Sequence, residues 1–139
     1  QAIRSENNED HQIIALPLYG KIAAGNPIEA INDPSMNIAV PCSLIGQGDH
    51  YALQVEGDSM IDAGIFDGDT AIIKKCESAE NGTIVVALVE NEEVTLKKLR
   101  KRNNSIALEP ANSLYETRIF GPDQVELQGK LVGIIRKYN

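Results

Sequence analysis

The sequence predicts a mainly β fold, in the form of a compact antiparallel sheet or barrel. Apolar residues come in short groups that are rich in β-branched side chains and too short for typical helices. Pairs of Gly, Asn and Asp residues separate these groups and are typical of tight turns. The chain has 139 residues, of which 42% are hydrophobic, and a domain of this size buries a core without a metal or a disulfide.

Residues 1–12 are polar and mixed in charge, and they predict a flexible inter-domain linker. Residues 13–139 are then expected to form the folded domain. Within it, β-branched runs predict strands at residues 51–56, 70–74, 83–89, 93–99, 106–108 and 130–136. The last run ends close to the chain terminus, where an edge strand can pair with a second copy of the chain. We therefore expect a homodimer.

Composition and charge argue against several functions. The formal net charge is −7, which disfavours direct binding of nucleic acid, since phosphate contacts need clustered Lys and Arg. One basic run, residues 97–102, is interpreted as a strand end that leads into a solvated turn. Cys42 and Cys76 have no metal-binding spacing, so we expect free thiols, a bacterial cytoplasmic location, and neither metal nor cofactor. No apolar run approaches the roughly 20 residues of a membrane span.

Ser59 is the candidate nucleophile. It follows a predicted strand and the turn residues Gly57 and Asp58, so its hydroxyl is expected to project from the end of the sheet. A serine hydroxyl is a weak nucleophile at neutral pH unless a neighbouring base accepts its proton. The two histidines are poor bases here, because His11 lies in the predicted linker and His50 beside a Gly-rich turn. Both histidines are interpreted as surface residues.

A lysine is the remaining candidate base, since serine–lysine pairs are known variants of the catalytic triad. Burial in apolar surroundings lowers the pKa of a lysine, and the neutral amine can then accept the serine proton. Lys97 and Lys98 stand in an apolar predicted strand. By strand alternation Lys97 shares a face with Thr95, and Lys98 shares the other face with Leu96. Periodicity alone does not say which lysine points inward.

Four separated motifs together resemble the LexA and UmuD type of self-cleaving protein. They are the lead-in Leu-Pro-Leu-Tyr-Gly-Lys-Ile-Ala-Ala-Gly (residues 16–25), Gly-Asp-Ser-Met-Ile with a following Asp-Gly-Asp (57–61 and 67–69), Val-Thr-Leu-Lys-Lys-Leu (94–99) and the closing Gly-Lys-Leu-Val-Gly-Ile-Ile (129–135). The resemblance spans nearly the whole chain. It implies the barrel-like β fold of LexA and signal-peptidase domains, here as a self-cleaving peptidase and dimerisation domain.

The resemblance also implies roles for individual residues. Ser59 matches the nucleophile, and Lys97, the first lysine of its motif, matches the general base. The backbone N–H groups of Asp58 and Ser59 are the implied oxyanion donors. The hydroxyl of Thr95 is implied to orient the lysine amine. Lys98 becomes a solvated neighbour.

The bond implied to be cut is Ala24–Gly25, within a cleavage-site region at residues 16–31. Cleavage is then intramolecular, so conformation rather than encounter sets its rate. In this family the stimulating partner is the RecA filament on single-stranded DNA. A LexA-type repressor of the SOS DNA-damage response also binds operator DNA through an N-terminal winged helix-turn-helix domain. That domain is absent from this sequence, which favours a truncated repressor.

Three other interpretations remain open. A UmuD-like subunit of a translesion polymerase has the same fold and chemistry and no helix-turn-helix domain. A dimerisation and partner-docking module with idle peptidase residues is a non-enzymatic alternative. A leader peptidase that acts on other proteins would use similar chemistry, but it needs a membrane anchor, and the sequence shows no apolar run of that length.

Overall fold

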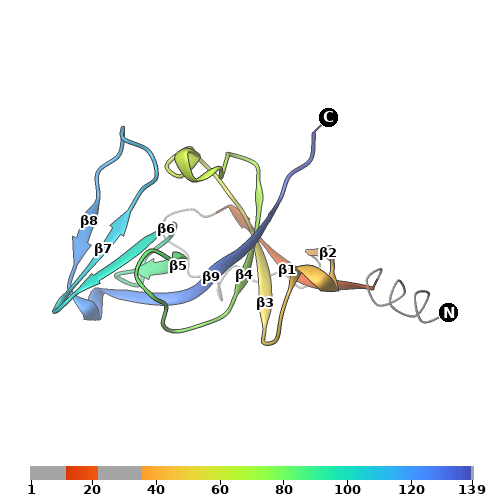
Figure 1. Cartoon of the computed structure of the whole chain (residues 1–139), viewed down its shortest axis with the longest axis horizontal. Helices are drawn as coiled ribbons and strands as arrows, with labels where there is room; N and C mark the ends of the chain where they lie inside the picture. The colour runs from red at the N-terminus through yellow and green to blue at the C-terminus, as the bar shows by residue number, and fades with distance from the viewer. Residues whose placement is uncertain (1–11, 22–35, 139) are drawn as a thin grey trace.

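A computed structural model describes residues 12–21 and 36–138 of the chain (Figure 1). The predicted mainly β fold is confirmed. The described residues form nine strands and three short 3₁₀ helices: β1 (Ile13–Lys21), β2 (Asn37–Pro41), η2 (Cys42–Leu44), β3 (His50–Gln54), η3 (Ile61–Ala63), β4 (Thr70–Lys74), β5 (Ile84–Val89), β6 (Glu93–Arg102), β7 (Ser105–Glu109), β8 (Arg118–Phe120), η4 (Pro122–Gln124) and β9 (Val125–Ile135).

The strands form one sheet in the order β2-β1-β3-β4-β9-β5-β6-β7-β8. The sheet is mixed, because β1 runs parallel to β3 while every other pair in the described residues is antiparallel. The antiparallel sheet expected from the short spacings therefore has one exception, the pair of β1 and β3. A parallel neighbour needs a long connection, and the 28 residues between β1 and β3 include β2, which pairs back onto β1.

The long strand β9 joins the two halves of the sheet and crosses the middle of the molecule in Figure 1. Its residues 125–130 pair with β5, and its residues 130–135 pair with β4. The expectation of a C-terminal edge strand therefore holds only in part. Strand β9 lies between β4 and β5 in the strand order, but among the described residues its residues 125–129 pair only with β5 and its residues 131–135 only with β4.

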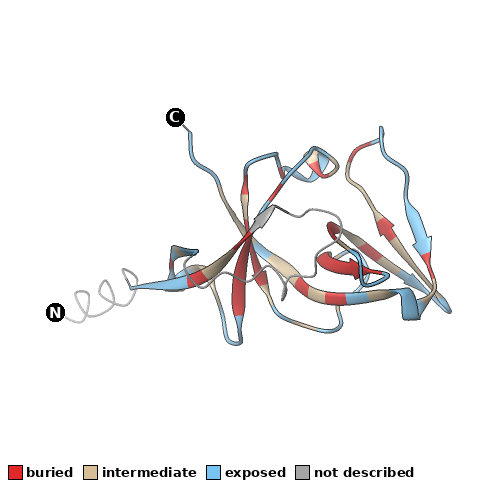
Figure 2. Cartoon of the chain, turned by 180° about the vertical axis from the view of Figure 1, so that it is seen from behind, coloured by how far each residue is buried: buried red, intermediate tan, exposed pale blue. Residues whose placement is uncertain are grey.

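Apolar side chains from both halves of the sheet meet in the interior. Buried residues gather along the central strands, and the connecting loops are mostly exposed (Figure 2). One apolar cluster contains side chains from β3, β4, β5 and β6. The turn after Ser59 adds Met60 and Ile65 to this cluster, and these two residues are 3% and 1% exposed. Two buried side chains thus anchor the turn that carries the candidate nucleophile to the apolar core.

His50 is buried, contrary to the surface position expected for it. Its residue is 7% exposed, and its Nδ1 lies 2.9 Å from the carbonyl oxygen of Gly48. His50 starts strand β3, where it pairs with Lys74 of β4, so its ring is enclosed by the sheet rather than by a surface turn. His11 lies outside the described residues.

Candidate active site

Ser59 sits on a turn whose shape depends on the glycine two residues earlier. Gly57 has a φ of +93°, in the left-handed region that side chains disfavour. Its N–H donates a hydrogen bond of 2.8 Å to Oδ1 of Asp67. Because this bond closes the loop between β3 and β4, Ser59 is held at the end of the strand, as the local sequence predicted.

Asp69 locks the same loop to the end of β9. Its side chain is 2% exposed in the ion pair with Arg136, which approaches both carboxylate oxygens to 2.7 Å. Asp69 Oδ2 also accepts a hydrogen bond from the N–H of Phe66. The pKa of Asp69 is lowered below its ordinary 3.8, chiefly by the bond from Arg136 and against the effect of burial. The Asp-Gly-Asp motif is therefore structural, with each aspartate fixing one part of the nucleophile loop.

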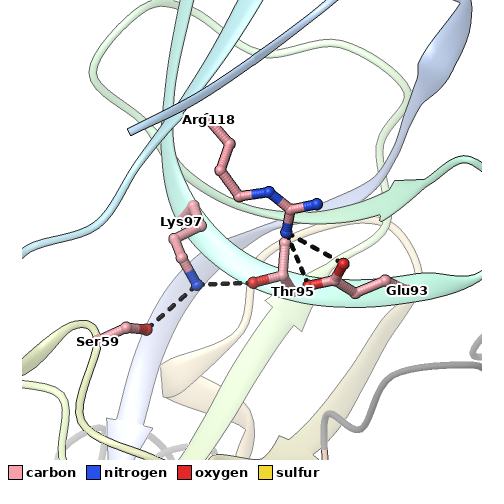
Figure 3. Close-up of polar contacts among 5 residues, drawn as sticks. All are labelled: Ser59, Glu93, Thr95, Lys97 and Arg118. Carbon is pink, nitrogen blue, oxygen red and sulfur yellow. Dashed lines mark hydrogen bonds and ion pairs between the residues drawn. The ribbon is translucent and has the colours of Figure 1, made fainter. Parts of the chain in front are cut away.

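Lys97 lies directly against Ser59 (Figure 3). Its Nζ is 3.1 Å from Ser59 Oγ and 2.7 Å from Thr95 Oγ1, and all three side chains are at least partly buried. Thr95 and Lys97 are two residues apart on β6, so alternation places them on one face of the strand. The structure brings together Ser59, Lys97 and Thr95, whereas no hydrogen bond joins Lys98 to Ser59 among the described residues.

The electrostatics around Lys97 favour a neutral amine. The pKa of Lys97 is lowered from its ordinary 10.5, mainly because burial penalises the charged form. The carboxylate of Glu93 acts in the opposite direction, and the guanidinium of Arg118 adds to the lowering. Arg118 Nη1 donates to both carboxylate oxygens of Glu93 at 3.0 Å (Figure 3), so the two charges whose effects on Lys97 oppose each other form one ion pair.

The backbone around Ser59 can stabilise an anion. Within the described residues, neither the N–H of Asp58 nor that of Ser59 donates to another protein group, so both can donate to a bound oxygen. A recess of about 50 Å³ lies beside them, lined by Val55, Gly57, Met60, Thr95, Leu96, Lys97 and their neighbours Glu56 and Ser59. The arrangement suits nucleophilic attack by Ser59 on a small acyl group.

Sequence analysis did not predict two residues near the site, Asn112 and Arg118. Asn112 hydrogen-bonds the carbonyl of Asp58, and Arg118 pairs with Glu93 beside Lys97. Neither residue stands in a motif, and each reaches the site from a loop or strand far along the chain.

Ala24 and Gly25 lie outside the described residues. In the described part, no cluster of His, Cys, Asp and Glu can hold a metal, and no helix is long and apolar enough to cross a membrane.

A serine and a lysine at hydrogen-bond distance, on a mixed β sheet and beside a pair of available backbone N–H groups, define the class of serine–lysine peptidase domains. The comparison with family models agrees with this class. Residues 17–132 match the Peptidase S24-like model. The chain belongs to the Peptidase S24-like family.

Its relatives narrow the identification further. The chain is 62% identical to a LexA repressor of Paramagnetospirillum magneticum over 125 residues, which are 90% of this chain and 53% of that protein. It is 60% identical to the LexA repressor of Granulibacter bethesdensis over 130 residues, covering 94% of this chain and 54% of that protein. The LexA repressor of Acidiphilium cryptum is 62% identical over 125 residues. The chain thus spans about half the length of these relatives.

Proposed function

We propose that this domain is the self-cleaving switch of a LexA-type repressor. The observation that carries the proposal is the 3.1 Å approach of Lys97 Nζ to Ser59 Oγ beside a small recess. A neutral Lys97 accepts a hydrogen bond from the serine hydroxyl and donates one to Thr95 Oγ1. Ser59 is then the nucleophile, Lys97 the base and Thr95 the group that orients the amine.

The proposed reaction has two stages. As Ser59 Oγ bonds to the carbonyl carbon of Ala24, its proton passes to Lys97 Nζ, and the carbonyl oxygen becomes an oxyanion held by the N–H groups of Asp58 and Ser59. The bond to Gly25 then breaks, and Lys97 returns the proton to the departing amine. The same lysine then takes a proton from water, and the hydroxide attacks the ester carbonyl. The bond to Ser59 Oγ breaks, Lys97 returns the proton to that oxygen, and Ala24 is left with a carboxyl group that ionises in water.

The size of the recess supports Ala24–Gly25 as the cut bond. The recess beside Ser59 and Lys97 has a volume of about 50 Å³, which suits a group as small as a methyl. Alanine before the bond supplies that methyl group, and glycine after it allows close approach of the backbone. Because the substrate belongs to the same chain, its effective concentration is very high, so control must act on docking rather than on encounter.

The partners follow from the family. We infer that the RecA filament on single-stranded DNA stimulates cleavage, that the protein acts as a homodimer, and that operator DNA is bound by an N-terminal winged helix-turn-helix domain. The net charge of −7 supports the last point, because this domain offers phosphates little attraction. The free thiols of Cys42 and Cys76 fit the reducing bacterial cytoplasm. Relatives named as repressors favour this function over that of a polymerase subunit.

Alkaline self-cleavage tests the proposal. The purified chain is incubated at neutral and alkaline pH, and mass spectrometry follows the fragments. We expect slow cleavage at neutral pH and faster cleavage as Lys97 loses its proton, with one cut after Ala24. Ser59→Ala and Lys97→Ala should each abolish the cut, and Lys98→Ala serves as the matched control that should cleave normally. A chain that stays intact at alkaline pH, or is cut elsewhere, contradicts the proposal.

A further inference from the structure

The loop formed by residues 111–115, here called the brace, is bonded to the nucleophile turn along its length. The N–H of Ala111 donates to the carbonyl of Ser59 at 2.8 Å, and the carbonyl of Ala111 accepts from the N–H of Asp62 at 2.7 Å. The side-chain Nδ2 of Asn112 donates to the carbonyl of Asp58 at 2.8 Å. The brace therefore contacts the residues on both sides of the serine.

Asn112 is held in one orientation. It is 8% exposed, and while Nδ2 bonds Asp58, its Oδ1 accepts a hydrogen bond of 2.9 Å from the N–H of Leu114. Both ends of the amide are used, so rotation of the side chain would break two bonds in a largely buried place. A donor fixed in this way sets the position of the group that it binds.

The group bound by Asn112 is half of the peptide unit that carries the Ser59 N–H. The Asp58 carbonyl and the Ser59 N–H lie in one plane, because the peptide bond does not rotate freely. A hydrogen bond to the carbonyl oxygen therefore fixes the direction of the N–H. It also polarises the amide, which makes the N–H a stronger donor.

Tyr115 binds the side chain of Asp58, the residue whose carbonyl oxygen Asn112 binds. Its hydroxyl donates a hydrogen bond to the Asp58 carboxylate, and that bond raises the pKa of Tyr115. A carboxylate next to an oxyanion pocket opposes the charge that develops there. The tyrosine bond fixes this carboxylate at the brace, at the position set by Asn112 and the backbone.

We propose that Asn112 is a positioning residue for the oxyanion donor of Ser59. The proposal rests on the self-cleaving function proposed above and adds a role to it. Asn112 does not touch the substrate. It acts through the Asp58–Ser59 peptide, so its loss slows formation of the tetrahedral intermediate and leaves the protonation of Lys97 unchanged.

The test compares self-cleavage rates of the parent chain and two Asn112 variants across pH. Asn112→Ala removes both hydrogen bonds without changing charge. We expect the rate on the alkaline plateau to fall about tenfold, less than the 10²–10³ typical for a deleted oxyanion donor because the N–H itself remains. The midpoint of the pH–rate profile should not move. Asn112→Asp keeps the acceptor for Leu114, loses the donor to Asp58 and adds a negative charge beside the oxyanion site, so its plateau rate should fall at least as far as that of Asn112→Ala.

Asn81→Ala is the matched control. Asn81 also bridges backbone groups through its amide, accepting from the N–H of Lys101 at 2.6 Å and donating to its carbonyl at 3.3 Å, but at a turn away from Ser59. The Asn81→Ala variant should cleave itself at the rate of the parent chain. An Asn112→Ala plateau equal to the parent, an equal loss in Asn81→Ala, or a shifted midpoint would each overturn the proposal.

The amide signal of Ser59 in a ¹H–¹⁵N spectrum at neutral pH gives a readout that does not depend on cleavage. Loss of the bond to the Asp58 carbonyl should shift this signal in Asn112→Asp and leave it unchanged in Asn81→Ala. An unshifted signal contradicts the proposal even if Asn112→Ala fails to fold. If the parent chain does not cleave while the signal shifts as expected, the self-cleaving function is wrong and the placement of the peptide by Asn112 is correct.

Discussion

Lys97 is placed for catalysis at the expense of stability. Burial lowers the pKa of Lys97 in the folded chain below the 10.5 of an exposed lysine. Below the folded pKa the charged amine destabilises the native state by the full amount, because the unfolded chain solvates it better. As pH rises from the folded pKa toward 10.5, the unfolded chain binds more protons than the folded chain, so stability increases.

Lys97→Met should therefore stabilise the domain at neutral pH, and the gain should shrink as pH approaches the ordinary lysine pKa. Urea unfolding in a Ser59→Ala background, where the chain stays intact, measures this difference. Lys98→Met is the matched control on the neighbouring residue and should change the neutral-pH stability less. A Lys97→Met variant that is less stable than its parent at neutral pH would show that packing of the lysine stem outweighs the burial of its charge.

The ion pair of Glu93 and Arg118 should set the pH at which Lys97 becomes active. Glu93→Gln removes the charge that raises the pKa of Lys97, so the midpoint of the pH–rate profile should move to lower pH. Arg118→Gln leaves Glu93 uncompensated and should move it to higher pH. The double variant should return close to the parent, since both charges are gone.

The expected shifts are modest. The side chains of Arg118 and Glu93 are 48% and 34% exposed, and exposed pairs are worth about 0.2–1 kcal/mol, which corresponds to roughly 0.15–0.7 of a pH unit. Added salt should reduce the effect of each single variant. Single-turnover cleavage across pH at two salt concentrations measures these shifts, and equal midpoints in all four chains would contradict the assignment.

Sequence reasoning located individual residues of the site better than their neighbours. The turn after β3 predicted the position of Ser59, and strand alternation predicted that Thr95 and Lys97 share a face. It did not separate Lys97 from Lys98, which only the family resemblance did. Asn112 and Arg118 were missed because each reaches the site through tertiary contacts, and no local pattern encodes a partner that lies so far along the chain.

At the scale of elements, strand identity was predictable where β-branched residues form long runs. Strand β4 matches its predicted bounds, and β5, β6 and β7 overlap their predicted runs, with no end more than three residues away. Strands β2 and β8 were missed, because a stretch of five or three residues carries too little periodic signal. The parallel pairing of β1 and β3 was also missed, since pairing direction depends on how a long connection closes.

Gly129 in β9 is the glycine with the least space for an added side chain among the described residues. A Cβ at this position would collide with Cγ2 of Ile73 and lie 2.7 Å from the carbonyl oxygen of Lys74. Gly129 also stands at the register shift where β9 passes from β5 to β4. Gly129→Ala should therefore destabilise the domain by about 1–3 kcal/mol, the usual effect of overpacking, measured by urea unfolding. Gly46→Ala, where an added Cβ meets no atom within 4 Å, is the control.

At the scale of the whole molecule, the C-terminal strand connects the proposed dimer surface to the active site. Arg136 follows β9 directly and binds Asp69 in the loop that carries Ser59. Over residues 131–135 the same strand pairs only with β4 within the described part of the chain, and a second copy could pair with its other backbone edge. A contact at this edge would therefore lie next to the segment that anchors the nucleophile loop.

The strand order ends at β2 on one side and at β8 on the other, and we compare the β9 edge with the edge at β8. Strand β8 has only three residues, so it can form few hydrogen bonds with a partner, whereas residues 131–135 provide a longer edge. Each edge carries an exposed apolar residue, Val132 at 38% and Ile119 at 69%. The greater exposure of Ile119 favours β8 as the dimer contact, whereas the greater length of the edge favours β9.

Paired charge substitutions separate the two edges. In a twofold dimer Val132→Lys places two like charges at the interface, so the dissociation constant from analytical ultracentrifugation should rise roughly tenfold or more, a change of about 1.4 kcal/mol. Ile119→Lys adds the same charge at β8 and should leave association unchanged. If Ile119→Lys weakens the dimer and Val132→Lys does not, the copies pair through β8. In that case Arg136 does not connect the dimer contact to the nucleophile loop.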